Sequence, residues 1–225
     1  MRFPGDAILF DLDGTLVDTA EDLCGALNRA LKSVGRPPVT VQQVRGMIGG
    51  GLPNLVMKGL EATGGPIPQV QYDEIVKNAR TDYQEHVADK SKPYPGVLEA
   101  LRGLSQRGTK MGVCTNKPAA ASKKLLAALG LDKYLAVVVG GDSLPVKKPH
   151  PQMAREVLKK LGNFAPEAAV LVGDSETDVK LARAAGLPVI LVEGGYTEIP
   201  VKDLGADMVI RGFSQLNEKL APPTH

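Results

Sequence analysis

The chain has 225 residues, of which 43% are hydrophobic and 23% are charged, an ordinary composition for a globular protein. That length suits one large domain or two unequal ones with a buried core. The formal net charge is +2 without a dense Lys/Arg block, so we expect no nucleic-acid partner. No apolar stretch approaches the roughly 20 residues of a membrane span, and the N-terminal apolar run is too short for a signal peptide. We therefore expect a cytoplasmic protein without membrane association.

Short β-rich apolar runs alternate with amphipathic segments along most of the chain, which is typical of a parallel sheet wrapped by helices. Several runs are almost continuously apolar, as strands buried on both faces must be. The expected strands are residues 7–10, 110–115, 135–139, 169–172, 188–192 and 208–210. The expected helices of this part are residues 119–129, 151–161 and 177–185. The pattern predicts an α/β fold with a Rossmann-like parallel-sheet core flanked by helices.

Residues 18–90 interrupt this alternation, because they contain helical patterns but no convincing strand. The clearest helical pattern covers residues 20–34, Thr40 is placed to cap a second helix, and residues 72–86 indicate a third. The segment that follows, 91–96, is rich in Pro and Gly and reads as a hinge or linker. We expect a small α-helical cap domain, 18–90, inserted after the first strand of a catalytic core formed by 1–17 and 91–225.

Polar side chains gather where the predicted strands end, or near the start of the helix between the third and fourth strands. They are Asp11, Asp13, Thr115, Asn116, Lys148, Asp174 and Asp178. Parallel α/β sheets bind ligands at the carboxyl ends of their strands, so we expect these side chains to form one site. Carboxylates on loop tips suit Mg²⁺. The three histidines and two cysteines do not cluster, which argues against zinc.

The same residue types predict phosphate chemistry. Lys148 supplies a point charge for phosphoryl oxygens, and Thr115 and Asn116 precede a helix whose first N–H groups favour anions. A carboxylate can attack a phosphate dianion once cations neutralise the phosphate oxygens. Asp11 then suits the role of nucleophile, giving an aspartyl-phosphate. Asp13, two residues on, suits a general acid that later acts as a base toward water.

Four segments resemble, in order, the four motifs of the haloacid dehalogenase superfamily. They are Asp11-Leu-Asp-Gly-Thr-Leu-Val-Asp-Thr19, Val113-Cys-Thr-Asn-Lys117, Lys148-Pro-His-Pro151 and Val172-Gly-Asp-Ser-Glu-Thr-Asp178. The resemblance covers essentially the whole chain, including the helical insertion. It implies that Asp11 is the nucleophile and a Mg²⁺ ligand. It also implies that Asp13 is the general acid/base, with its backbone carbonyl on the metal, and that Asp174 is a direct metal ligand.

The resemblance implies supporting roles for the remaining motif residues. Thr115, Asn116 and Lys148 would bind the phosphoryl group, and Asp178 would hold either the metal-bound water or Lys148. An aspartate at position 13 also argues against a true dehalogenase, which lacks one there.

Within the superfamily, the chain most resembles the phosphoglycolate phosphatases, because segment 44–52 is similar to the glycine-rich cap loop of that group. The resemblance implies Mg²⁺-dependent conversion of 2-phosphoglycolate, through an aspartyl-phosphate, to glycolate and phosphate. Gly49 and Gly50 would bring bare backbone N–H groups toward a small anionic substrate, and Arg45 would contact its carboxylate. A flexible interhelical loop and a solvated helix arginine are the alternative interpretations of these positions.

Three other functions stay open at this point. Two are enzymes on the same scaffold: a phosphomutase of β-phosphoglucomutase type and a sugar-phosphate phosphatase. The third is a phospho-aspartate signalling receiver, which needs neither Asp13 nor a helical cap. In the enzyme interpretations the partner is a small phosphorylated metabolite, and the sequence leaves monomer and homodimer open.

Overall fold

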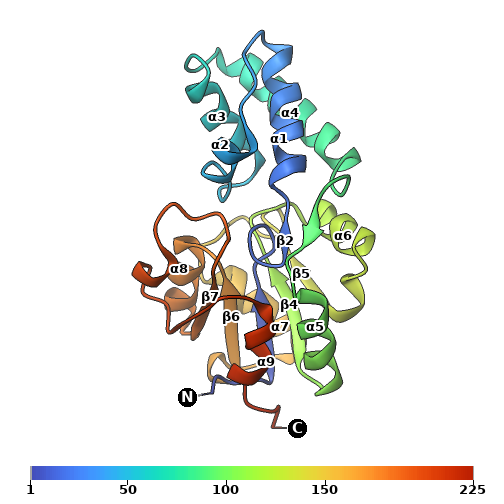
Figure 1. Cartoon of the computed structure of the whole chain (residues 1–225), viewed down its shortest axis with the longest axis vertical. Helices are drawn as coiled ribbons and strands as arrows, with labels where there is room; N and C mark the ends of the chain where they lie inside the picture. Colours follow the sequence, from blue (N-terminus) through green and yellow to red (C-terminus); the bar gives the residue numbers. More distant parts are fainter. Residues whose placement is uncertain (1, 225) are drawn as a thin grey trace. The chain divides into compact units, whose positions relative to one another are not determined.

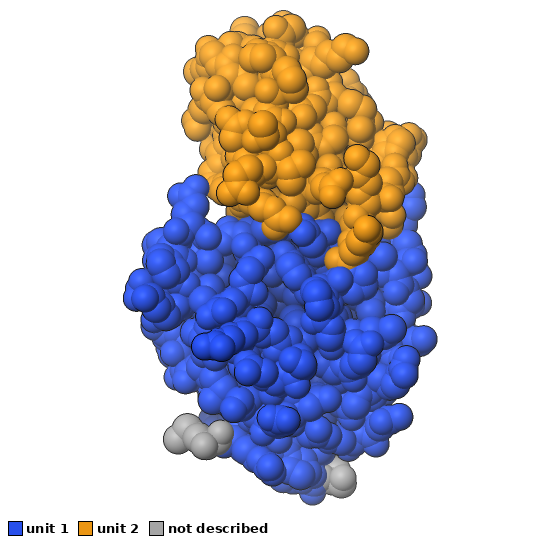
Figure 2. All heavy atoms as spheres, viewed as in Figure 1, with its two compact units in different colours: residues 1–18, 93–225 blue, residues 19–92 orange. Residues whose placement is uncertain are grey.

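The computed structural model describes residues 2–224 of the chain. The chain divides into two compact units, one formed by residues 1–18 and 93–225 and the other by residues 19–92 (Figure 2). The domain boundaries expected from the sequence were 1–17 with 91–225, and 18–90. The chain passes from one unit to the other at β2 (Val17–Asp18) and β3 (Lys92–Pro93), which pair as a two-stranded sheet.

The unit formed by 1–18 and 93–225 contains a six-stranded sheet whose neighbouring strands are all parallel (Figure 1). Its strands are β1 (Ala7–Phe10), β4 (Lys110–Cys114), β5 (Val137–Val139), β6 (Ala169–Gly173), β7 (Val189–Val192) and β8 (Met208–Ile210). All six strands predicted from the sequence are confirmed. Strand β5 begins at Val137 rather than at 135, because a 3-10 turn over Asp132–Tyr134 precedes it.

Helices cover the sheet and close its core. Helices α7 (Gln152–Gly162) and α8 (Glu176–Ala185) pack against one face, where Ala7 and Leu9 join their buried side chains. Because successive side chains of a strand point to opposite faces, Phe10 lies on the other side, with its ring centroid 6.3 Å from that of Phe213. The same unit contains α6 (Ala119–Ala128) and α9 (Leu216–Lys219).

Helix α5 (Val97–Gln106) was not predicted, although its buried residues repeat at helical spacing. It directly follows the Pro/Gly-rich segment that we interpreted as a linker. Its N-cap is Gly96 in a left-handed conformation, with φ of 82°, and no side-chain cap precedes it. The usual Ser, Thr, Asp or Asn start signal is therefore missing.

The strand order is β5-β4-β1-β6-β7-β8, so β1 lies at the centre of the sheet. Ala7 is in register with Lys110 of β4 on one side and with Ala169 of β6 on the other. From β1 the strand order runs to β4 and β5 on one side and to β6, β7 and β8 on the other. Open α/β sheets bind ligands at such a reversal of strand order, outside the carboxyl ends of the strands.

The unit formed by residues 19–92 is helical. Helix α1 (Ala20–Ser33) packs against α2 (Val41–Arg45), α3 (Leu52–Ala62) and α4 (Gln69–Glu85). The buried carboxylate of Asp22 accepts hydrogen bonds from the backbone N–H groups of Lys90 and Ser91, at 3.0 and 2.8 Å, which ties the start of α1 to the end of this unit. None of the helices within residues 2–224 is both long enough and apolar enough to cross a bilayer.

Three of these four helices were predicted and one was missed. Thr40 caps α2 as expected, since its hydroxyl accepts a hydrogen bond from the N–H of Gln43 and its own N–H donates to the Gln43 side chain. Helix α4 starts three residues before the expected position 72. Helix α3 was not predicted, because it starts after Gly51, whose φ of 84° and missing side chain give no capping pattern to recognise.

Candidate active site

The chemical groups of the site follow three neighbouring strands. Asp11 comes directly after β1, Thr115 after β4 and Asp174 after β6. The sheet ladder extends one step beyond the strands, because Asp11 N–H donates to Val172 at 2.9 Å and Thr115 N–H donates to Val139 at 3.0 Å. The backbone of Asp11 and Thr115 is therefore set by the sheet rather than by a flexible loop, and the N–H of Asp174 donates to Oδ2 of Asp178 at 3.3 Å.

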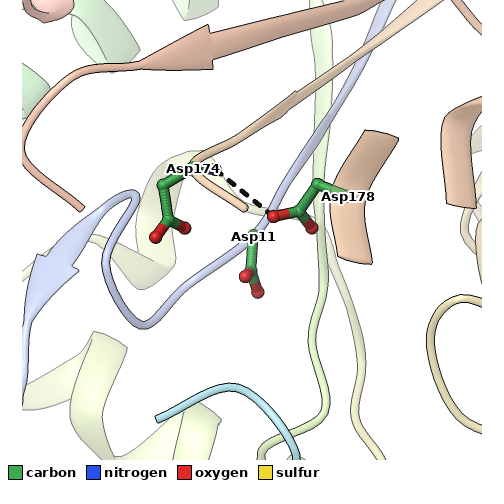
Figure 3. A group of neighbouring side chains, drawn as sticks. All are labelled: Asp11, Asp174 and Asp178. Atoms are coloured by element: carbon green, nitrogen blue, oxygen red, sulfur yellow. Dashed lines mark hydrogen bonds between the residues drawn. The ribbon is translucent and has the colours of Figure 1, made fainter. Parts of the chain in front are cut away.

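Three carboxylates meet at this edge of the sheet. Asp11, Asp174 and Asp178 each offer one oxygen, and these oxygens all lie within 4.8 Å of one another (Figure 3). Asp174 and Asp178 are buried, at 1% and 0% exposure. The side chain of Asp13 is not a member of this group. Its expected metal contact runs through the backbone carbonyl and stays a prediction.

The electrostatics of the group favour a bound cation. Burial, reinforced by Asp178 and Asp11, raises the pKa of Asp174 to about 8. Burial also raises the pKa of Asp11 to about 6, even though Lys148 opposes the shift. Two neighbouring acids whose raised pKa values oppose ionisation are a setting that a divalent cation relieves. A compact set of carboxylate oxygens on strand ends fits Mg²⁺, which takes one or two carboxylates together with substrate phosphate and water.

Asp174 is held in one orientation from two sides. Thr15 donates its hydroxyl to Oδ1 at 2.7 Å, and the backbone N–H of Tyr196 donates to Oδ2 at 2.7 Å. Two glycines allow this close approach. A Cβ on Gly14 would lie 2.5 Å from Oδ2 of Asp174, and one on Gly195 would lie 2.3 Å from the same atom.

Lys148 links two of the three acids. Its Nζ lies 2.8 Å from Oδ1 of Asp11 and 2.8 Å from Oδ1 of Asp178. Burial by itself lowers the pKa of Lys148, but the carboxylates of Asp11 and Asp178 outweigh burial and raise it. The ammonium group therefore stays charged beside the expected nucleophile. Two roles were left open for Asp178, holding a metal-bound water or holding Lys148. The hydrogen bond from Lys148 Nζ to Oδ1 of Asp178 fits the second role.

The side chain of Asn116 contacts the backbone of Lys148. Its Nδ2 donates to the Lys148 carbonyl at 3.2 Å, and its Oδ1 accepts from the Lys148 N–H at 2.8 Å. The side-chain amide of Asn116 thus hydrogen-bonds to both the carbonyl and the N–H of Lys148, whose side chain carries the buried ammonium group. This contact differs from the expected role, and direct binding of a phosphoryl group by Asn116 stays a prediction.

Thr115 is buried, and its hydroxyl accepts a hydrogen bond of 3.2 Å from the backbone N–H of Lys117. Helix α6 begins just beyond, at Ala119, after Pro118 as its N-cap. A helix start beside a hydroxyl is a favourable place for an anion. The expected contact between Thr115 and a phosphoryl group stays a prediction.

Lys117 is a second buried lysine of the site. Its Nζ lies 2.9 Å from Oδ1 of Asp13, and the two side chains are only 3% and 15% exposed. The sequence analysis quoted Lys117 inside a motif but gave it no role. Thr15 and Tyr196 were likewise given no contact. Lys117 and Thr15 stand inside quoted motifs, but their partners, Asp13 and Asp174, lie far away in the sequence. Nothing local shows that Tyr196 reaches Asp174 either.

The three residues expected to choose the substrate lie in the unit 19–92. Arg45 is the last residue of α2, and Gly49 and Gly50 lie in the turn between α2 and α3. Gly49 has a φ of 135°, in the region that favours glycine. Their expected contacts with a substrate stay predictions.

Comparison with known proteins gives consistent matches over most of the chain. A family model described as haloacid dehalogenase-like hydrolase matches residues 8–192. A protein of Caulobacter vibrioides named phosphoglycolate phosphatase is 43% identical over 209 residues, which is 93% of this chain and 88% of that protein. A plasmid-encoded phosphoglycolate phosphatase of Cupriavidus necator is 41% identical over 224 residues, covering 99% and 96% of the two chains.

Solved structures give the same result for the fold. A crystal structure of a predicted phosphoglycolate phosphatase from Haemophilus somnus has a TM-score of 0.90 and 31% identity, covering 97% of this chain and 98% of that one. CbbY from Rhodobacter sphaeroides, in complex with phosphate, has a TM-score of 0.80 and 26% identity, covering 96% of both chains. Both likenesses therefore include the helical unit as well as the sheet.

Proposed function

The chain belongs to the haloacid dehalogenase-like hydrolases, and from that membership we propose that it is a Mg²⁺-dependent phosphatase of 2-phosphoglycolate. The observation that carries the proposal is the convergence of Asp11, Asp174 and Asp178 with the Nζ of Lys148 at the strand ends. The choice of substrate rests on the names of the Caulobacter and Cupriavidus relatives.

Asp11 and Asp174, together with the backbone carbonyl of Asp13, would hold the Mg²⁺. When bound, the cation supplies positive charge that offsets the repulsion between an attacking carboxylate and the phosphate oxygens. Lys148 adds a second positive charge from the protein side. Thr15 and Tyr196 keep the Asp174 carboxylate oriented for this purpose.

In the first step, a carboxylate oxygen of Asp11 attacks phosphorus. Within residues 2–224, the hydrogen bonds that Asp11 accepts from Leu12 N–H, at 2.7 Å, and from Lys148, at 2.8 Å, both end on Oδ1. We therefore assign the attack to Oδ2. The bond between phosphorus and the glycolate oxygen breaks, and Asp13 gives its proton to that oxygen. The products of this step are glycolate and an aspartyl-phosphate at Asp11.

In the second step, water replaces the carboxylate. The water oxygen attacks phosphorus while Asp13, now ionised, takes a proton from the water. The bond between Asp11 and phosphorus breaks, inorganic phosphate leaves, and both aspartates return to their starting states.

A substrate panel tests the proposal. Initial rates with Mg²⁺ are measured for 2-phosphoglycolate, glucose 6-phosphate, glycerol phosphate and p-nitrophenyl phosphate, with Asp11→Asn as the inactive control. We expect kcat/KM for 2-phosphoglycolate to exceed that of the sugar phosphates by more than about tenfold. Preference for a sugar phosphate would overturn the substrate assignment and leave the phosphatase assignment standing. Conversion of β-glucose 1-phosphate to glucose 6-phosphate without release of phosphate would indicate a mutase.

The metal requirement has its own test. Protein treated with EDTA and then dialysed should lose turnover and regain it when Mg²⁺ is added. Turnover that survives the chelator unchanged would contradict the assignment of Asp11 and Asp174 as metal ligands.

A further inference from the structure

Two buried ammonium groups serve the site, one for each aspartate of the first motif. Lys148 lies 2.8 Å from Asp11, and Lys117 lies 2.9 Å from Asp13. The Lys117 side chain is 3% exposed, and a buried ammonium group needs a hydrogen-bond acceptor, which Oδ1 of Asp13 offers both when the acid is ionised and when Oδ2 carries the proton. The Asp13 pairing is therefore a stable feature of the fold rather than a chance surface contact.

The backbone of Lys117 is fixed on both sides. Its N–H donates to the hydroxyl of Thr115 at 3.2 Å, and its carbonyl accepts from the N–H of Gly141 at 3.0 Å. Pro118 follows directly and starts α6. The lysine side chain thus extends from an immobile backbone, which is what a group that must hold another side chain requires.

The backbone of Asp13 is equally constrained. It sits in a tight turn, where Gly14 N–H donates to the carbonyl of Val17 at 3.0 Å and Leu16 N–H donates to that of Leu12 at 3.0 Å. With the backbone set, the remaining freedom of Asp13 is rotation of its carboxylate. The ammonium of Lys117 lies within hydrogen-bonding distance of that carboxylate.

We propose that Lys117 is a positioning residue that holds the carboxylate of Asp13 in its working orientation and stabilises the charge that forms on it during the reaction. The inference rests on the proposed function. In the first step, the Asp13 O–H bond breaks and the proton moves to the leaving oxygen. The electron pair stays on Asp13 beside the ammonium. In the second step, water returns a proton to Asp13. Lys117 gives up no proton in either step, so its contribution is electrostatic and geometric.

Steady-state kinetics separates this role from substrate binding. Lys117→Met keeps the length of the side chain and removes its charge, while Lys117→Arg restores the charge. We expect Lys117→Met to lower kcat with 2-phosphoglycolate by about 100-fold, with KM within about threefold of its original value, and Lys117→Arg to recover part of the loss. The matched control is Lys123→Met, an exposed lysine on α6, which should leave both constants unchanged. A raised KM with kcat intact would show that Lys117 binds substrate directly and would overturn the inference.

A double-mutant cycle tests whether Lys117 acts through Asp13. If it does, Lys117→Met should cause no further loss of kcat in the Asp13→Asn background, because the partner it positions is already gone. Losses that multiply would show independent action and overturn the inference. Thermal melting of each variant checks folding, and Lys117→Gln replaces Lys117→Met should the latter fail to fold.

The same cycle is run with p-nitrophenyl phosphate, whose leaving group needs no proton. Asp13 then matters only for hydrolysis of the aspartyl-phosphate, so we expect Lys117→Met to show a burst of p-nitrophenol followed by slow turnover. If the wild-type chain rejects 2-phosphoglycolate, the proposed substrate fails, while this cycle still decides the role of Lys117. The absence of a burst, together with kcat losses that multiply in the double variant, would refute the positioning role of Lys117. The proposed substrate would not be affected by that result.

Discussion

The strand-end site and the glycine-rich loop of the helical unit are built in opposite ways. At the strand ends, Asp174 and Lys148 are buried and each is held by several partners. In the loop, Gly49 and Gly50 are exposed, and a Cβ on Gly49 would meet nothing within 4 Å. A group that breaks bonds must be held in place by its surroundings, whereas a loop can change its sequence without disturbing a core. The contrast supports the proposal that the reaction belongs to the unit with the sheet and the choice of substrate to the helical unit.

The largest effect is expected at Asp11. Asp11→Asn removes the attacking oxygen's charge while keeping the shape of the side chain, so kcat should fall by at least about 10⁴-fold. Turnover of 2-phosphoglycolate measures the loss, and a thermal melt checks that the fold is intact. Appreciable remaining turnover would mean that another group attacks phosphorus.

A smaller effect is expected from Gly195→Ala, which pushes a methyl group against the Asp174 carboxylate. Displacing a residue that supports a metal ligand typically costs 10–100-fold in metal affinity, so the apparent Mg²⁺ constant should weaken by about 100-fold. Magnesium titration of activity gives the value. The matched control is Gly212→Ala, which has open space around the added methyl and an extended φ of 174°. Equal behaviour of the two variants would contradict the steric argument.

The pH dependence sharpens the comparison further, since it concerns the strand-end acids alone. The pKa of Asp174 is raised from 3.8 to about 8 in the metal-free fold, so Mg²⁺ must displace a proton below that pH. We expect Mg²⁺ affinity to fall about fivefold between pH 8 and pH 7, because the ionised fraction of Asp174 falls by that factor, as measured by calorimetry. Affinity that does not change over this range would contradict the raised pKa.

The same shift affects stability without metal. Because the folded chain holds the Asp174 proton up to about pH 8 and the unfolded chain releases it near 3.8, the free energy of unfolding should decrease as pH rises between these values. Denaturant unfolding of metal-free protein at several pH values measures the slope. Asp174→Asn is the control and should flatten the slope between about pH 6 and pH 8, while Asp11, with a pKa of about 6, still contributes at lower pH.

The smallest effect is expected in the helical unit. Arg45→Ala should lower kcat/KM for 2-phosphoglycolate by about threefold, the scale of a partly exposed charge. Turnover of p-nitrophenyl phosphate, which has no carboxylate, should stay the same. An equal loss with both substrates would contradict a role for Arg45 in recognising the carboxylate.

The strands of the sheet and the acids of the site could be predicted because short stretches of sequence are enough to identify both. Continuous apolar runs such as 169–172 mark buried strands, and Asp11 and Asp174 stand directly after such runs. Helices α3 and α5 were not predicted, although their buried residues repeat at helical spacing, because each follows a glycine that offers no side-chain cap to mark its start. The contact between Tyr196 and Asp174 spans two strands of the sheet and appears only when they are placed side by side. Lys117 needed the same step, because its partner Asp13 lies 104 positions earlier.

The central place of β1 has a consequence for synthesis of the chain on the ribosome. The strand that leads to Asp11 is made first, but its neighbours are β4 and β6, which begin at Lys110 and Ala169. At 5–20 residues per second, on the order of ten seconds pass before β6 emerges. During that time the helices of 19–92 have local contacts with which to fold, while β1 has none. The nascent chain thus carries an apolar strand without its sheet partners until β4 and β6 are made, and we expect chaperone dependence to concentrate on residues 7–10.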